Sequence, residues 1–153
     1  RLARYLALGL PLALLAGAYA FQYGAGLPPC EMCWWQRYPL FAAVALAALA
    51  MFRPSGRLLV WLAALAIAVS GVIGAFHAGV EYGWWEGVTA CTVTSLGGSA
   101  DPLEAIMNAP LVRCDVAPWS LMGVSLAGWN FLFCTAGALA IALLLTRKAK
   151  VLP

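Results

Sequence analysis

The sequence predicts an all-α membrane protein, a bundle of four transmembrane helices. Apolar residues make up 64% of the 153 residues and charged residues only 10%, whereas soluble domains have about 45–50% and about 25%. Four long stretches contain no charged residue, and the few charges are divided unequally between the connecting segments. So few charges cannot cover a water-exposed surface. Intrinsic disorder, a nucleic-acid-binding protein and an ordinary soluble enzyme are therefore poor interpretations.

The uncharged stretches define the expected spans. They comprise residues 5–30, 38–52, 58–80 and 116–146. A bilayer core about 30 Å thick needs roughly 20 helical residues, so the second span must begin further back, near Cys33. We expect spans at about residues 5–23, 33–52, 58–77 and 119–145 within a single domain, residues 1–153. Continuous apolar runs favour helices over a β-barrel, although the first run could also be a cleavable signal peptide.

The charged residues predict the orientation of these spans. Seven of the nine basic residues fall on one side of the four-span arrangement: Arg1, Arg4, Arg53, Arg57, Arg147, Lys148 and Lys150. All six acidic residues fall on the other side, with Arg37 and Arg113. Because basic loops stay in the cytoplasm, we expect both termini and the turn at residues 52–58 to be cytoplasmic. The net charge of +3 is then a topology signal and gives no evidence of nucleic-acid binding.

Small residues in the third span, among them Ser70, Gly71 and Gly74, are typical of helices that approach closely in lipid. They favour a compact bundle. The outer segment at residues 78–118 is the longest connection. Within it, Asp101-Pro102-Leu103-Glu104 resembles a capped helix start. We therefore expect a short amphipathic helix to about Asn108, which could lie on the membrane surface.

The predicted topology divides the five cysteines into two groups. Cys30, Cys33, Cys91 and Cys114 lie on the outer side, where an even number of cysteines is expected to pair. Cys134 lies inside the fourth span and is interpreted as a packing residue. Two cysteine pairs on one membrane face could simply staple the protein, or could exchange electrons through mixed disulfides.

Cys30-Glu31-Met32-Cys33 stands at the start of the second span, directly after two prolines. Exposed N–H groups and the helix dipole at such a site stabilise a thiolate. Arg37 follows at helical spacing, so Cys30, Cys33 and Arg37 are expected to share a face. The motif could be a static disulfide, half of a zinc site or a redox centre. Haem attachment is disfavoured because Trp34 replaces the required histidine, and the wide separation of Cys91 and Cys114 disfavours a zinc site.

Arg37 and His77 are expected at similar depth near the outer ends of their spans. A charge below the interface suggests function, although Arg37 could also extend to the lipid headgroups. His77 could be an ordinary interfacial residue. Together the two side chains could flank a small-molecule pocket between helices, where an imidazole could donate a hydrogen bond to a reduced oxygen.

The combined motifs resemble one known family. Pro29-Cys30-x-x-Cys33-x-x-Gln36-Arg37, His77 with Glu81 a turn later, Cys91, and Cys114-Asp115 followed by Trp119 are similar to the disulfide bond formation protein B (DsbB) family. The resemblance covers nearly the whole chain. Glu31 and Met32 are unexceptional in the motif, and the family assigns no role to Cys134.

The resemblance implies a bacterial inner-membrane thiol oxidase that depends on a quinone, ubiquinone or menaquinone. Its partner would be a periplasmic thioredoxin-fold oxidase of the DsbA type. By the same likeness Cys91 would be attacked by the partner, releasing Cys114, which would pass electrons to Cys30. Cys33 would meet the quinone, with Arg37 stabilising charge on it and His77 contributing. Competing interpretations are a vitamin K epoxide reductase-like enzyme and a non-catalytic membrane module stapled by disulfides.

Overall fold

The computed structural model describes residues 1–89 and 112–150, except the side chains of 148–150. Its α-helices are α1 (Leu2–Tyr19), α2 (Glu31–Phe52), α3 (Arg57–Glu81) and α5 (Leu126–Lys150). The π-helix η1 (Ala20–Gly24) continues α1, and two short strands, β1 (Ser120–Leu121) and β2 (Val124–Ser125), precede α5. Within these described residues, four helices are long and apolar enough to cross a membrane, which confirms the predicted fold class. The expected helix near residues 101–108 lies outside the described residues.

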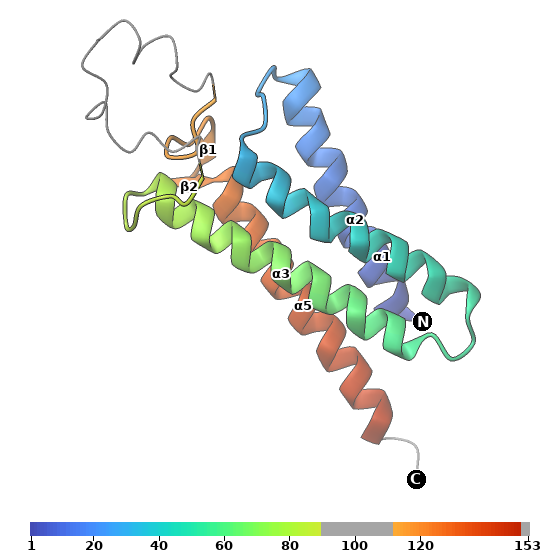
Figure 1. Ribbon diagram of the computed structural model, residues 1–153. Coiled ribbons are helices and arrows are strands. Elements are labelled where there is room, and N and C mark those ends of the chain that lie inside the picture. Colours follow the sequence, from blue (N-terminus) through green and yellow to red (C-terminus); the bar gives the residue numbers. More distant parts are fainter. Residues whose placement is uncertain (90–111, 151–153) are drawn as a thin grey trace, which may run out of the picture.

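The helices form a bundle in which α3 packs against α2 and α5, and α1 packs against the same two helices. Figure 1 shows both termini at the end of the bundle that carries the α2–α3 turn. Two hydrogen bonds close this end: Arg4 Nη2 donates to the carbonyl of Pro54, and Arg57 Nη2 to that of Leu145, each at 2.9 Å. The first apolar run is thus an integral part of the bundle.

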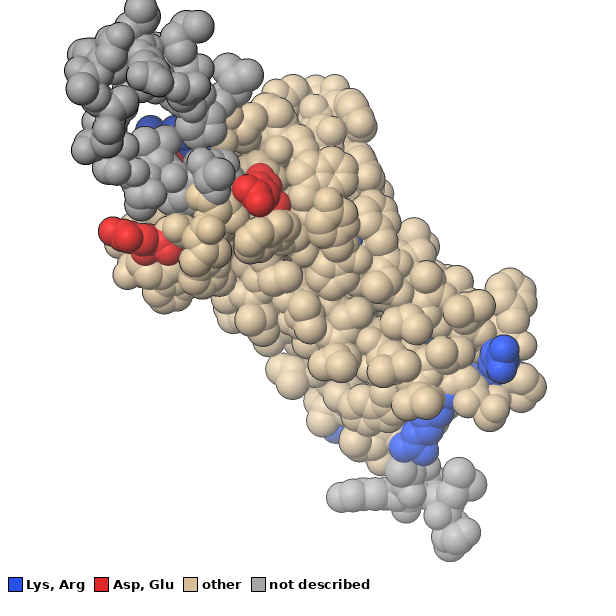
Figure 2. All heavy atoms as spheres, in the orientation of Figure 1, with Lys and Arg blue, Asp and Glu red and all other residues tan. Residues whose placement is uncertain are grey.

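Charged side chains gather at the two ends of the bundle. Figure 2 shows basic residues at the end that carries the termini, acidic residues at the opposite end, and a wide uncharged zone between them. This separation is what a membrane-spanning bundle needs, since charges in the hydrocarbon core are costly. Which end faces the cytoplasm stays a prediction from the charge pattern.

Glycines allow α3 and α5 to pack closely. A Cβ atom at Gly71 would lie 3.0 Å from the Cβ of Cys134, and one at Gly74 would lie 2.9 Å from the carbonyl oxygen of Ala127. Such distances leave no space for a side chain, as the small-residue pattern predicted. Cys134 is fully buried in the core of the bundle, in agreement with its interpretation as a packing residue.

The last helix begins at Leu126 instead of near Trp119. The intervening residues form the β1–β2 hairpin, with Met122 and Gly123 in its turn at φ values of 54° and 77°. Left-handed backbone at two successive residues is incompatible with an α-helix but is typical of a tight hairpin turn. Ser125 then caps α5 by accepting a hydrogen bond from the Gly128 N–H at 3.1 Å. The Tyr82 hydroxyl, at the end of α3, donates to the carbonyl of Gly123 and fixes the hairpin.

Candidate active site

The C-x-x-C motif forms the first turn of α2. Cys30 is the N-cap, with extended backbone, and its sulfur accepts a hydrogen bond from the Cys33 N–H at 3.3 Å. The Cys30 thiol donates to the Cys33 sulfur, with 2.9 Å between the two atoms. This hydrogen bond and the burial of Cys30 raise the pKa of the Cys30 thiol above its ordinary value. When the pair shares a single proton, that proton therefore stays on Cys30.

Cys30 faces the outer connection. It is 5% exposed and packs with Met32, Val80 and the fully buried Cys114. The sulfurs of Cys30 and Cys114 and a ring nitrogen of His77 lie within 4.8 Å of one another. Cys114 is disulfide-bonded, so its sulfur is not a thiolate ligand for a metal ion in this state. The cluster instead brings a thiol beside a disulfide sulfur, the arrangement that exchange requires. Cys91 lies outside the described residues.

The side chain of His77 lies next to that of Cys30. Its Nε2 atom is 3.6 Å from the Cys30 sulfur and 3.8 Å from Glu81 Oε1, and its Nδ1 atom is 2.8 Å from Gln36 Nε2. The imidazole is only 2% exposed. His77 is not among the residues that line the pocket described next, so a contact with a ligand held there stays a prediction from the sequence.

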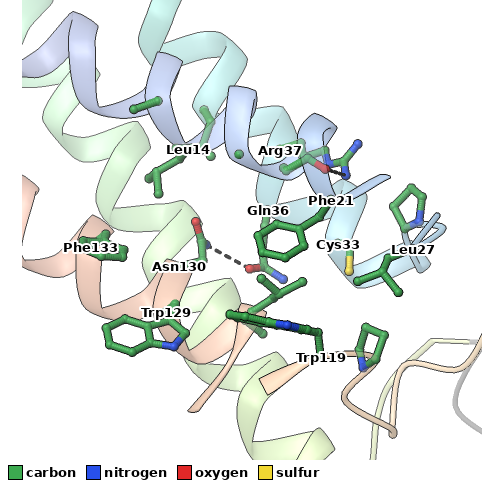
Figure 3. Close-up of a pocket in the computed structure, with 18 of the residues that line it drawn as sticks. Leu14, Phe21, Leu27, Cys33, Gln36, Arg37, Trp119, Trp129, Asn130 and Phe133 are labelled. Carbon is green, nitrogen blue, oxygen red and sulfur yellow. Dashed lines mark hydrogen bonds between the residues drawn. The ribbon is translucent and has the colours of Figure 1, made fainter. Parts of the chain in front are cut away.

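Cys33 lines a pocket of about 430 Å³ between the bundle and the hairpin, shown in Figure 3. The residues around it are mainly aliphatic and aromatic, among them Leu14, Phe21, Leu27, Leu40, Trp119, Leu126, Trp129 and Phe133. Four lining residues bring polar groups or sulfur: Cys33, Gln36, Arg37 and Asn130. An apolar cavity of this size with a few convergent polar groups is typical of a small-molecule site.

The π-helix brings Phe21 to this pocket and Gln22 to Arg37. Phe21 lines it and packs against Trp119, with ring centroids 4.9 Å apart. Gln22 Oε1 accepts a hydrogen bond from Arg37 Nη1 at 2.6 Å. A π-turn rotates the residues that follow it relative to a regular α-helix, and such turns are frequent at functional sites. Here the turn ends the first helix beside the start of α2.

Arg37 is buried at the rim of the pocket and is 6% exposed. Besides Gln22, its guanidinium donates to the Ala18 carbonyl at 3.3 Å. It also lies over the rings of Tyr19 and Trp34, at 4.8 and 4.9 Å from their centroids. The cation is therefore held inside the bundle by aromatic and polar partners and does not extend outward to the surface. A buried guanidinium with five N–H donors can still bind an oxygen at the pocket rim.

The three residues expected to share a helix face are thus divided. Cys33 and Arg37 line the pocket, whereas Cys30 is absent from its lining. The reason is local: Cys30 is the non-helical N-cap, with φ −75° and ψ 175°, so helical spacing does not apply to its side chain. Each sulfur of the motif consequently has its own surroundings.

Four polar residues within the spans were not predicted as parts of the site. Gln36 Nε2 approaches His77 Nδ1, Asn130 Nδ2 donates to Gln36 Oε1 at 2.9 Å, and the Ser70 hydroxyl donates to the Gln36 carbonyl at 2.8 Å. Gln22 is the fourth, through its bond to Arg37. Polar side chains inside otherwise apolar spans are the signal that could have found them, because such groups need partners in lipid.

Comparisons with known proteins place these features in a family. No solved structure matches the chain. A Polaromonas protein named disulfide bond formation protein B is 31% identical over 91% of this chain and 86% of its own length. A Shewanella protein of that name is 32% identical over 79% of this chain and 73% of its own length. The family model described as disulfide bond formation protein DsbB matches residues 1–144. The chain therefore belongs to the DsbB family of disulfide-forming membrane oxidoreductases.

Proposed function

We propose that this protein reoxidises a periplasmic thioredoxin-fold dithiol oxidase of the DsbA type and passes the two electrons to a membrane quinone. One observation carries the proposal. The two sulfurs of the C-x-x-C motif face different surroundings: Cys30 lies within 4.8 Å of the disulfide-bonded Cys114, and Cys33 lines an apolar pocket. A dithiol placed in this way can receive electrons on one side and release them on the other.

The electrons would enter through the outer cysteines. The partner's thiolate attacks Cys91 in a Cys91–Cys114 disulfide, and Cys114 leaves as a thiolate. Cys114 then attacks Cys30 in the Cys30–Cys33 disulfide, so that Cys33 leaves as a thiolate on the pocket side. The partner's second thiolate then attacks its mixed disulfide with Cys91, which forms the partner's disulfide and releases Cys91, and the Cys91 thiolate attacks Cys114 and releases Cys30. Each of the four exchanges forms one S–S bond and breaks one, so the two electrons of the partner's dithiol reach the Cys30–Cys33 pair. The free thiols at Cys30 and Cys33 beside a disulfide-bonded Cys114 correspond to a state in which the inner pair holds the electrons.

The pocket fits a quinone ring. A ring with two carbonyl oxygens and an apolar tail needs aromatic or aliphatic walls and a few hydrogen-bond donors. The aromatic side chains of Phe21 and Trp119 supply walls, and the guanidinium of Arg37, whose five N–H groups are not all used by Gln22 and Ala18, supplies donors. A bound quinone accepts two electrons and two protons. Arg37 would stabilise the negative charge that develops on a quinone oxygen, as preorganised donors do, and Cys33 would be the sulfur in contact with the ring.

The proposed place of the protein is the bacterial inner membrane, with both termini in the cytoplasm and the four outer cysteines in the periplasm. The charge pattern supports this orientation, because the basic end of the bundle carries the termini and the α2–α3 turn. The oxidising compartment would then contain both the partner and the loop disulfide.

The test is a coupled assay with the purified protein in detergent. A reduced thioredoxin-fold oxidase is added with ubiquinone or menaquinone, and loss of quinone absorbance is followed together with loss of partner thiols. We expect one quinone consumed for each partner disulfide formed, and no turnover when quinone is omitted or Cys33 is replaced by Ala. Quinone consumption that persists in Cys33→Ala would exclude the proposed exit. Absence of all turnover would favour a disulfide-stapled module, and preference for a quinone epoxide would favour the vitamin K epoxide reductase-like alternative.

A further inference from the structure

A chain of buried polar groups connects α5, α3 and the C-x-x-C motif. We propose that Gln36 is a positioning residue that holds His77 with its proton on Nε2, so that His77 donates to Cys30 and Cys30 donates to Cys33. The inference rests on the proposed function, in which Cys33 must carry negative charge on the pocket side. It assigns Gln36 a role that neither its residue type nor its position in the motif indicates.

The orientation of the Gln36 amide is fixed by a backbone carbonyl. Gln36 Nε2 lies 3.3 Å from the Met32 carbonyl oxygen, which can only accept a hydrogen bond. The atom facing Met32 is therefore the NH₂ group of the amide. The same NH₂ group is 2.8 Å from His77 Nδ1. Because an NH₂ group can only donate, Nδ1 accepts and carries no proton.

Asn130 fixes the same orientation independently. Its Nδ2 atom lies 3.2 Å from the Ser70 carbonyl oxygen, a second group that can only accept. The Asn130 NH₂ group therefore faces inward and donates to Gln36 Oε1 at 2.9 Å. Its other end, Oδ1, accepts from the Cys134 thiol at 3.4 Å. The carbonyl oxygens of Met32 and Ser70, on different helices, thus require the same orientation of the Gln36 amide. Reversing that amide would place its oxygen against the Met32 oxygen and its NH₂ group against the Asn130 NH₂ group.

The tautomer of His77 follows from this assignment. A neutral imidazole has one N–H, and since Nδ1 accepts, the proton is on Nε2. Nε2 faces the Cys30 sulfur at 3.6 Å and Glu81 Oε1 at 3.8 Å, and the imidazole also hydrogen-bonds the main chain of Cys114. Cys30 in turn gives its own proton to the Cys33 sulfur at 2.9 Å. All donors in the series therefore point in one direction, from Gln36 through His77 and Cys30 to Cys33.

The direction matters because it decides which sulfur is left without a proton. Cys33 accepts at the end of the series and lines the pocket. The opposite tautomer would present a bare Nε2 lone pair to Cys30 and take the Cys30 proton away from Cys33. The other titratable or charged groups around the series are Arg37 on α2, Glu81 on α3 and, while reduced, Cys114 in the outer connection. His77 is 2% and Gln36 6% exposed, so little water competes with these hydrogen bonds.

Nuclear magnetic resonance can determine the tautomer directly. The chain contains one histidine, so protein labelled with ¹⁵N-histidine and purified without a histidine tag gives only two ring nitrogen signals. We expect a protonated Nε2 and an unprotonated Nδ1 in the wild-type dithiol form. In Gln36→Leu the Nδ1 lone pair loses its hydrogen-bond donor, so the Nδ1 signal should shift downfield and the tautomer protonated at Nδ1 should gain population. The control is Ser70→Ala, which removes a buried hydroxyl that donates to the main-chain carbonyl of Gln36 but is not bonded to His77, and which keeps the wild-type signals.

A wild-type signal with the proton on Nδ1 overturns the proposal, as does an unchanged signal in Gln36→Leu. Should Gln36→Leu fail to fold, the wild-type spectrum alone still decides the tautomer. These measurements need neither quinone nor partner protein. If the proton is on Nε2 but no quinone is consumed, the proposed function fails and the tautomer assignment survives. If quinone is consumed but the proton is on Nδ1, only the role of Gln36 is rejected.

The consequence for Cys33 is tested by its alkylation with iodoacetamide, read by mass spectrometry of the peptide. At neutral pH we expect Gln36→Leu to react about tenfold more slowly than wild type, as expected for one lost hydrogen bond in a charge-stabilising series, whereas Ser70→Ala reacts at the wild-type rate. The difference should shrink as the pH rises toward 10, where an ordinary thiol is already largely ionised. A difference that persists there would reflect altered access to the pocket and would overturn the proposal.

Discussion

On one side of the first turn of α2, Cys30 packs with the disulfide-bonded Cys114 and faces His77. On the other side, Cys33 opens onto an apolar pocket whose rim carries Arg37. The two sulfurs are 2.9 Å apart, so electrons and a proton can pass between them although their surroundings differ. The comparison teaches that one helix turn can separate a thiol-exchange site from the site of a lipid-soluble ligand. Cys30 is the N-cap and has non-helical backbone, so its side chain does not lie on the helix face that Cys33 occupies.

The largest effect is expected when the sulfur on the pocket side is removed. In Cys33→Ala, a reduced thioredoxin-fold partner should attack Cys91 and remain attached, because the electrons have no exit. Non-reducing electrophoresis and peptide mapping should show the mixed disulfide at Cys91, with turnover lost entirely. Cys134→Ala is the control, since it removes a buried thiol whose hydrogen bond goes to Asn130 and to neither sulfur of the motif, and it should still turn over. A mixed disulfide at Cys30 would reverse the proposed entry and exit.

The next largest effect is expected from the cation on the pocket side. Arg37→Ala should lower quinone use about tenfold to a hundredfold, through KM, kcat or both, because a preorganised donor to a developing anion is lost. Reaction of the loop cysteines with the partner should be unaffected. The control is Arg57→Ala, which also removes an arginine bonded to a helix carbonyl, but at the opposite end of the bundle. Unchanged quinone kinetics in Arg37→Ala would refute its role.

Much of this arrangement could be predicted from the sequence. Composition and uncharged stretches predict the four apolar helices, and the position of the C-x-x-C motif after two prolines predicts a helix start that the N-cap Cys30 confirms. Small residues in the third span predict the close approach at Gly71. These properties are local or depend only on residue type, so they can be recognised along the chain.

What could not be predicted depends on local backbone conformations that the residue types do not indicate, or on contacts between distant residues. The hairpin before α5 depends on a left-handed Met122, a conformation that residue type does not favour. The partition of Cys30 from Arg37 follows from the N-cap geometry, and the bond between Gln36 and His77 joins residues on different helices. Helical spacing along one segment contains no information about either.

A smaller effect tests the packing behind the two sites. Gly74→Ala should destabilise the protein by about 1–3 kcal/mol, because the added carbon would lie 2.9 Å from the Ala127 carbonyl and overpacking has this cost. The carbon would also lie 3.1 Å from Asn130 Nδ2, so quinone use should fall as well. Gly9→Ala is the control: a Cβ there meets no atom within 4 Å, and its stability should be unchanged or higher. Thermal unfolding in detergent measures the stability of both variants. Equal unfolding midpoints for Gly74→Ala and the wild type would show that α3 and α5 have room to separate.

The smallest effect is expected next to the exchange side. Asp115 accepts two hydrogen bonds from Arg113, at 2.9 and 2.6 Å, and this pairing lowers the pKa of the Asp115 carboxyl. A lowered folded-state pKa means that the contribution to stability is present above the ordinary carboxyl pKa and is lost as the pH falls through the lowered value. Because the pair is largely exposed, its contribution is small and salt-sensitive. Asp115→Asn should therefore shift the unfolding midpoint slightly at neutral pH and low salt, and not at all near pH 2 or in molar salt. A shift that persisted at acidic pH would show that Asp115 holds Cys114 in place by packing instead of by charge.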